Sequence, residues 1–103
     1  MLAIAPDLFF ASKIDATLRA AGHDVTIVSW VEGPMPNAPE VVVVDLDNTD
    51  WAAGLPTGAP LLGFYSHVDV ETRRRAEQAG FDLVVPRSRM AREMPALVEG
   101  LLR

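Results

Sequence analysis

Four consecutive valines, Val41–Val44, followed directly by Asp45, restrict the fold of this chain more than any other feature. β-Branched residues favour the extended conformation. A strand that is apolar on both sides offers neither face to water, so it has to be covered on both. Strands of this kind occur in parallel sheets with helices on each side. The run therefore predicts the central strand of an α/β domain.

The rest of the chain alternates short apolar runs with segments of helical periodicity. Asp7 and Asp69 stand at helix-capping positions, and Gly22 and Gly80 at helix ends. Pro95 is expected in the first turn of the last helix. We expect strands over Leu2–Ala5, Val25–Trp30, Val41–Val44, Pro60–Tyr65 and Asp82–Val85, and helices over Leu8–Ala21, Val70–Ala79 and Ala91–Leu102. This alternation predicts a flavodoxin-like, doubly wound five-stranded parallel sheet of order 2-1-3-4-5.

Two connections are too short or too rich in proline and glycine for a full helix. Glu32–Pro39 reads as a loop, and Asn48–Ala59 leaves room for one helical turn around Trp51–Ala53. The helical layer is therefore expected to be reduced after the second and third strands, which leaves one sheet face thinly covered and open to a partner. Trp51 is expected to pack over the loop that follows the valine run.

Composition narrows the functional classes. The 103 residues are 50% hydrophobic, which fits one domain over residues 1–103. With no cysteine, disulfides and thiolate metal sites are excluded. No apolar run approaches the length of a membrane span, and the start of the chain lacks the basic flank of a signal peptide. A net charge of −5 disfavours direct binding of nucleic acid. We expect a stand-alone cytoplasmic domain without membrane contact.

The predicted topology brings several polar side chains to one edge of the sheet. In such folds ligands bind outside the carboxyl ends of the strands, where the strand order reverses. The residues expected at those ends are Asp7, Asp45, Asp47, Tyr65, Ser66 and Arg87. They form the predicted functional site.

The order and spacing of these elements resemble the receiver domains of bacterial two-component response regulators over nearly the whole chain. The resemblance is strongest at Asp45 after the valines, at Ala79–Asp82 before the last strand, and at Arg87. It implies that Asp45 occupies the phosphoacceptor position. The family's acidic pair falls on Ala5 and Pro6, with Asp7 one position beyond. Its hydroxyl position falls on Tyr65 next to Ser66, its lysine on Arg87 and its switch aromatic on Val84.

These departures alter the chemistry that the resemblance implies. Mg²⁺ prefers oxygen ligands, and Ala5 and Pro6 supply no side-chain oxygen. We therefore expect no cofactor, with weak Mg²⁺ binding at Asp7 and Asp45 as the alternative, although Asp7 is expected to cap a helix. Arg87 can grip a carboxylate with two parallel hydrogen bonds. Our hypothesis is that Arg87 pairs with Asp45 and replaces the charge of the metal.

The resulting prediction is a degenerate, non-enzymatic receiver that acts on other signalling proteins through protein–protein contacts. A functional receiver phosphorylated on Asp45 is one alternative. The other is a phosphohydrolase, because residues 41–49 also resemble the first motif of the haloacid-dehalogenase type, with Asp45 as nucleophile and Asp47 as general acid/base. That family also needs a lysine, sometimes an arginine, and a later acidic pair for magnesium. The chain has no lysine after Asp45 and no paired acids after Arg87.

The second half of the chain carries most of the arginines. Exposed arginines on a helix form either a solvated face or a docking patch. The resemblance implies pairing through the face made by the helix over 70–79, the strand over 82–85 and the helix over 91–102. We therefore expect a weak, salt-sensitive homodimer there, with Arg73, Arg74, Arg75, Arg89 and Arg92 at the interface.

Overall fold

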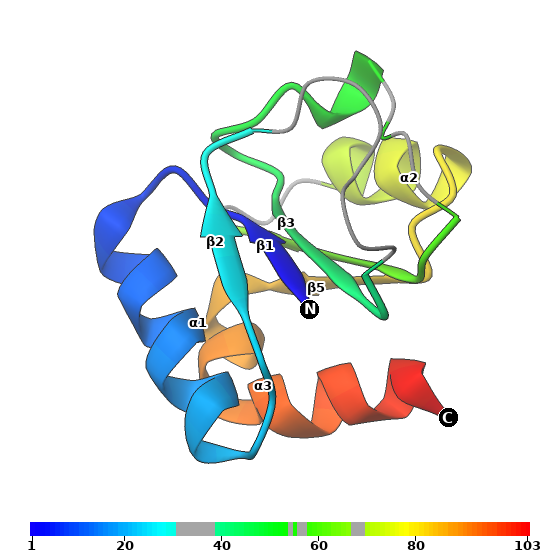
Figure 1. The fold of residues 1–103 in the computed structure, drawn as a ribbon. Helices are drawn as coiled ribbons and strands as arrows, with labels where there is room; N and C mark the ends of the chain where they lie inside the picture. The colour runs from blue at the N-terminus through cyan, green and yellow to red at the C-terminus, as the bar shows by residue number, and fades with distance from the viewer. Residues whose placement is uncertain (31–38, 54, 56–57, 67–69) are drawn as a thin grey trace.

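The computed structural model describes residues 1–30, 39–53, 55, 58–66 and 70–103, and it contains a single five-stranded parallel sheet (Figure 1). The strand order is β2-β1-β3-β4-β5, and every pair of neighbours is parallel. This order confirms the predicted flavodoxin-like sheet. The elements are β1 (Leu2–Ile4), α1 (Leu8–Ala20), β2 (Thr26–Val28), β3 (Val42–Asp45), the 3₁₀ turn η1 (Trp51–Ala53), β4 (Leu61–Tyr65), α2 (Val70–Gln78), β5 (Leu83–Pro86) and α3 (Arg87–Leu102).

The valine run forms the central strand, as predicted. Strand β3 lies between β1 and β4, and all four of its residues are buried. Val43 belongs to the hydrophobic cluster on one face of the sheet. Val42 and Val44 belong to the cluster on the other face. Alternating side chains of one strand thus fill two separate cores.

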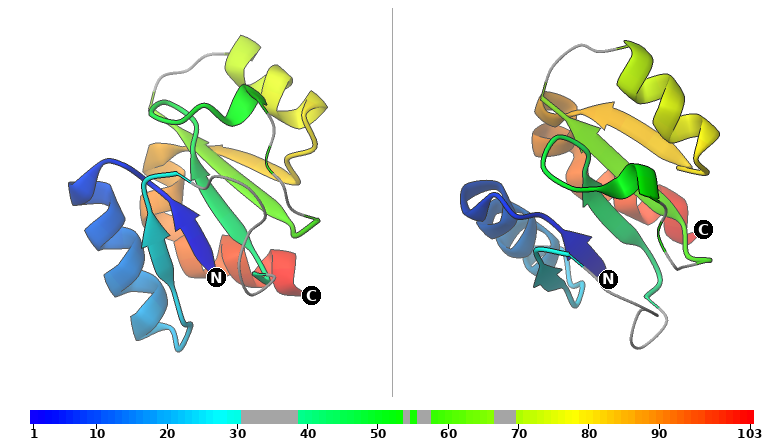
Figure 2. Two further views of the ribbon diagram at one scale, coloured as in Figure 1. Left: turned by 45° about the horizontal axis from the view of Figure 1, so that its top comes forward. Right: turned by 90° about the horizontal axis from the view of Figure 1, so that it is seen from above.

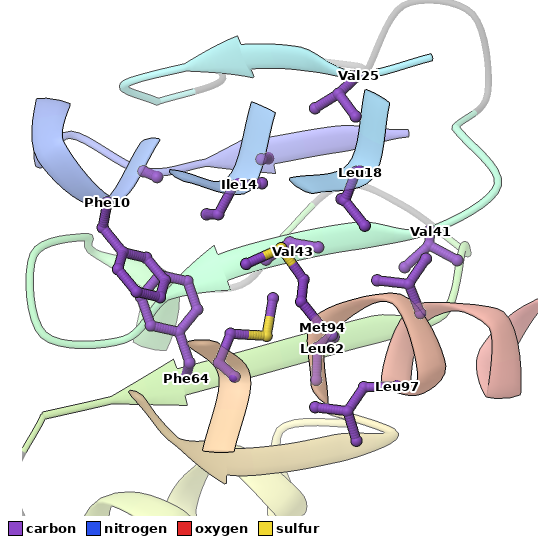
Figure 3. Close-up of a cluster of buried hydrophobic side chains, with 14 of the residues drawn as sticks. Phe10, Ile14, Leu18, Val25, Val41, Val43, Leu62, Phe64, Met94 and Leu97 are labelled. Carbon is purple, nitrogen blue, oxygen red and sulfur yellow. The ribbon is translucent and has the colours of Figure 1, made fainter. Parts of the chain in front are cut away.

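Helices α1 and α3 cover the first of these faces (Figure 2). Phe10, Ile14 and Leu18 recur at helical spacing on α1 and are buried against the sheet. Figure 3 shows them meeting Met94 of α3 and Val43 of β3 in one layer. Dispersion and removal from water hold this layer together.

Helix α2 and the turn η1 pack on the second face, where Trp51, Ala76 and Phe81 contact the sheet residues. The short turn after β3 confirms the reduced helical layer between β3 and β4. The segment 31–38, where the other reduced connection was expected, lies outside the described residues. The expectation of a thinly covered face is wrong for the central strands, because Ile4 and Val44 are fully buried there.

The last helix begins four residues earlier than the pattern indicates. Helix α3 starts at Arg87, with Pro86 as its extended N-cap residue, instead of at Ala91. Met90 is fully buried one turn before Met94, so the apolar stripe of the helix extends back to its first turn. Pro95 consequently lies inside the helix, not in its first turn as expected. Because proline has no N–H, the carbonyl of Ala91 loses its helical donor there.

The other boundaries differ by one or two residues. Asp7 caps α1 as predicted, accepting hydrogen bonds from the N–H groups of Phe9 and Phe10. Gly22 and Gly80 follow α1 and α2 with φ of 91° and 100°, a left-handed conformation that glycine adopts without strain. The predicted cap at residue 69 lies outside the described residues. Strand β2 is shorter than predicted, because Ser29 and Trp30 fall beyond its pairing with β1.

The packing of α1 gives a direct test of the fold. Ile14 is fully buried between α1 and the sheet, whereas Lys13 beside it is exposed. Ile14→Ala should lower the free energy of unfolding by about 2–5 kcal/mol through lost burial and a residual cavity. Lys13→Ala should change it by less than about 0.5 kcal/mol. Urea denaturation followed by circular dichroism measures both, and equal effects of the two variants would contradict this packing.

Candidate functional site

The carboxyl ends of four parallel strands meet at one edge of the sheet and carry a connected set of polar side chains. The chain of contacts runs from Asp7 after β1 to Arg87 after β5, then to Ser66 after β4, and on to Asp47 and Asp45 at the end of β3. The strand order places these ends side by side. The topology therefore assembles the predicted site, except for Tyr65.

Asp45 is the buried centre of this site. Its relative exposure is 1%, and among the described residues it is the only buried polar or charged one. One carboxylate oxygen, Oδ1, accepts a hydrogen bond of 3.0 Å from the backbone N–H of Asp47. The other, Oδ2, accepts one of 2.8 Å from Nδ2 of Asn48. The loop after β3 thus folds back over the carboxylate and satisfies both of its oxygens.

The same loop is tied to the neighbouring strand and to itself. Oδ2 of Asp47 accepts a hydrogen bond of 2.6 Å from the backbone N–H of Ser66, directly after β4. Oγ1 of Thr49 donates to the carbonyl of Asp45 over 2.6 Å. Asp47 and Thr49 both lie in the segment 41–49 that resembles the phosphohydrolase motif. In this structure their hydrogen bonds fix the path of the loop after β3.

Arg87 pairs with Asp7, and the hypothesis that it pairs with Asp45 is wrong. Its Nη2 lies 2.6 Å from Oδ2 of Asp7, and its Nη1 lies 3.4 Å from Oγ of Ser66. The physical reason lies at the helix ends. Arg87 is the first residue of α3 and Asp7 caps α1, and these two helices cover the same sheet face. Asp7 is thus both the cap of one helix and the ionic partner of the next.

This pair is further shaped by its surroundings. The guanidinium carbon of Arg87 lies 4.4 Å from the centre of the Phe10 ring, a cation–π contact on its apolar side. The hydrogen bond from Arg87 lowers the pKa of Asp7 below its ordinary value, and the N–H groups of Phe9 and Phe10 lower it further against an opposing effect of burial. The arrangement favours an ionised Asp7.

Other predicted residues lie away from this network. Tyr65 is buried in the hydrophobic cluster on the α2 face, so its side chain belongs to the core. On the expected docking face, Arg73 pairs with Glu77 at 3.6 Å, and Arg89 and Arg92 both reach Glu93, at 3.3 and 3.5 Å. Arg74 and Arg75 are exposed on α2.

Two residues of the site were missed from the sequence. Asn48 bonds the buried carboxylate, and Phe10 supports Arg87. Asn48 could have been found, because an aspartate followed by Asn and Thr at the end of a strand is typical of a side-chain-stabilised turn. Phe10 reads as a core residue by its helical spacing, and its contact with Arg87 depends on the position of α3, which the sequence placed wrongly.

The residues of this edge do not fit a receiver-type magnesium site. Ala5 and Pro6 carry no side-chain ligand atoms, and Asp7 is engaged by Arg87. Within the described residues no three His, Asp or Glu side chains are close enough together to hold a metal ion. No described helix is both long enough and apolar enough to cross a membrane.

Comparison with known proteins establishes the fold. The structure is similar to the crystal structure of a response regulator CheY-like protein from Mesorhizobium loti, with a TM-score of 0.75 and 17% sequence identity over 97% of this chain and 95% of that chain. No protein-family model and no curated protein sequence matches the chain. The chain therefore has the receiver-like fold that the resemblance implies.

The ionic contact at this edge makes stability depend on pH. Because the pKa of Asp7 is lowered in the folded chain, its carboxylate stabilises the fold above about pH 3.8, the ordinary value, and this contribution is lost as the pH falls below it. Asp7→Asn should therefore flatten the loss of stability on acidification. The variant Asp24→Asn, at an exposed aspartate, should leave it unchanged. Thermal unfolding between about pH 6 and pH 3 measures this, and identical profiles for Asp7→Asn and the unaltered chain would contradict the assignment.

Proposed function

We propose that this chain is a signalling domain of the receiver fold that acts through contacts with other proteins and is not switched by Mg²⁺-dependent phosphorylation of Asp45. The observation that carries the proposal is the state of Asp45. The residue is 1% exposed, and both of its carboxylate oxygens accept hydrogen bonds from the loop that follows β3. A phosphoryl donor needs one of those oxygens free and accessible.

The neighbouring charges support the same proposal. Phosphorylation of a carboxylate adds negative charge, which a metal or a free cation has to neutralise. Arg87, the cation of the site, is 2.6 Å from Asp7 and is committed to it. The residues at the family's acidic-pair positions, Ala5 and Pro6, offer no replacement.

The two alternatives receive less support. A functional receiver would need Asp45 to be released from Asn48 and the backbone of Asp47, and a metal to be bound by residues other than Ala5 and Pro6. A phosphohydrolase would need Asp47 as a mobile acid/base, whereas its carboxylate accepts a hydrogen bond of 2.6 Å from the N–H of Ser66. Protein contacts remain the function that a fixed receiver fold can serve.

An amide NMR titration with Mg²⁺, followed by Mg²⁺ with beryllofluoride, tests the proposal. Beryllofluoride mimics an aspartyl phosphate. With both carboxylate oxygens of Asp45 engaged, the amides of Asp7, Asp45, Ser66 and Arg87 should not shift at millimolar Mg²⁺. Shifts clustered on these residues would instead show a working phosphoacceptor site.

A gain-of-function variant provides the positive control for that titration. Pro6→Asp together with Arg87→Lys restores a carboxylate at the position of the acidic pair and removes the guanidinium that donates to Asp7 through Nη2. This double variant should respond to Mg²⁺ where the unaltered chain does not. If neither the double variant nor the unaltered chain shows amide shifts with Mg²⁺, the site is closed by the loop over Asp45 and not by the Asp7–Arg87 pair.

We also propose a weak homodimer through α2, β5 and α3. The support is the mixed charge of this face, where exposed arginines alternate with Glu77 and Glu93. Each of these glutamates is paired with an arginine of its own chain. Exchange of partners between two copies would conserve the number of ion pairs, so the affinity is expected to be low.

Sedimentation velocity tests this dimer. The average mass should rise with protein concentration at low salt and fall back to that of a monomer at about 0.5 M salt, because such contacts are screened. Arg73→Glu with Arg89→Glu should abolish the association. Lys13→Glu, on α1 and outside this face, should leave the association unchanged. A monomer at high concentration and low salt would contradict the proposal.

A further inference from the structure

A cavity lies at the opposite edge of the sheet from Asp45. Its volume is about 300 Å³, and it is bounded by η1, the start of β4, the end of α2 and the residues that lead into β5. Leu61 begins β4 and Asp82 precedes β5, so this pocket opens at the amino ends of the strands. Asp45 and Arg87 lie at the carboxyl ends, and the pocket is therefore separate from the site described above.

Aromatic side chains form the floor of the pocket, and a ring contact and a hydrogen bond fix their positions. Trp51, Leu61 and Phe81 line it and are only 6–8% exposed. The rings of Trp51 and Phe81 meet edge to face, with centroids 5.7 Å apart and planes at 84°. Nε1 of Trp51 donates to the carbonyl of Leu46 over 2.9 Å, which fixes the indole. Trp51 thus packs over the loop after β3, as predicted, while one part of it borders the pocket.

The rim of the pocket is polar and negative. Asp82 is exposed at the rim, and its Oδ2 accepts a hydrogen bond of 2.8 Å from the N–H of Leu61. Its Oδ1 accepts none from the described residues. Ala79 and Gly80 line the same rim directly after the last residue of α2, where the carbonyl end of the helix adds partial negative charge. A carboxylate and a helix C-terminus above aromatic rings favour a cationic group.

The chain itself shows that this indole accepts a guanidinium. The guanidinium carbon of Arg75, on α2, lies 5.5 Å from the centre of the Trp51 ring. Arg75 is exposed and is not among the residues that line the pocket. The part of the ring that borders the pocket is therefore not taken by Arg75, although the positive charge of Arg75 opposes a second cation at the same indole.

We propose that this pocket binds the side chain of one arginine presented by a partner protein. A volume at the lower limit of ligand-binding clefts suits one side chain, and the carboxylate of Asp82 at the rim disfavours an anionic nucleotide. Arginine fits better than lysine, because its planar guanidinium stacks on aromatic rings and forms paired hydrogen bonds with a carboxylate. The inference rests on the proposed function in that the occupant belongs to a protein, but the pocket's selectivity for guanidinium does not depend on the state of Asp45.

The test is an amide NMR titration with N-acetyl-argininamide, with N-acetyl-citrullinamide as a neutral control of the same shape. Shifts should cluster on Trp51, Phe81 and Asp82 with a dissociation constant roughly in the millimolar range, as expected for a single side chain without its protein. The citrulline compound should give no such shifts. Equal responses to both compounds, or shifts confined to the Asp45 edge, would overturn the proposal.

Three variants sharpen the test. Asp82→Asn keeps an acceptor for the N–H of Leu61 but removes the charge, and should weaken binding roughly three- to fivefold. Arg75→Gln removes the opposing positive charge and should strengthen it. Asp24→Asn, at an exposed aspartate between α1 and β2, should leave it unchanged. Unaltered affinity in Asp82→Asn would overturn the proposal even if the citrulline control is silent. The Mg²⁺ titration reads only the opposite edge, so failure here is distinguishable from failure of the proposed function.

Discussion

Burial of β3 on both faces is the constraint on which the rest of the structure depends. Val42 and Val44 fill one core and Val43 the other, so helices or turns have to pack on each side. Parallel neighbours on either side of β3 then bring four strand ends to one edge, with Asp45 at the centre. The position of this side chain follows from the packing of apolar residues, and its closure by the following loop follows from the need to satisfy a polar group that is no longer in water.

The contact between Asp7 and Arg87 changes what this edge can do. Asp7 ends the connection after β1 and caps α1, while Arg87 begins α3 directly after β5. Their pairing at 2.6 Å therefore joins the first turns of the two helices on one sheet face. A receiver needs a free carboxylate there for a metal and a free cation for a phosphoryl group. In this chain Asp7 and Arg87 pair with each other, and we propose that this pairing makes the polar edge part of the structural framework.

Much of the fold could be predicted from the sequence, because periodicity and capping residues reflect local physics. The strand order, the cap at Asp7 and the turn at Trp51 all follow from such signals. The start of α3 could not, because its N-cap residue, Pro86, makes no side-chain capping hydrogen bond and Ser88, a residue type that favours helix caps, lies inside the helix. Met90, the first buried residue of this helix, owes its burial to tertiary packing. The choice of Asp7 over Asp45 as the partner of Arg87 depends on that start. The position of Asp45 at the end of β3 follows from the valine run, whereas its hydrogen-bond partners depend on the path of the loop after it.

Intact-mass spectrometry after incubation with acetyl phosphate and Mg²⁺ tests the central claim, the closure of Asp45, most directly. The buried carboxylate, held by the backbone of Asp47 and by Asn48, should remain unmodified while the chain stays folded. The variant Asp45→Asn, which lacks the acceptor, should give the same unmodified spectrum. Addition of one phosphoryl group to the unaltered chain, absent in Asp45→Asn, would show that the site opens and would contradict the claim.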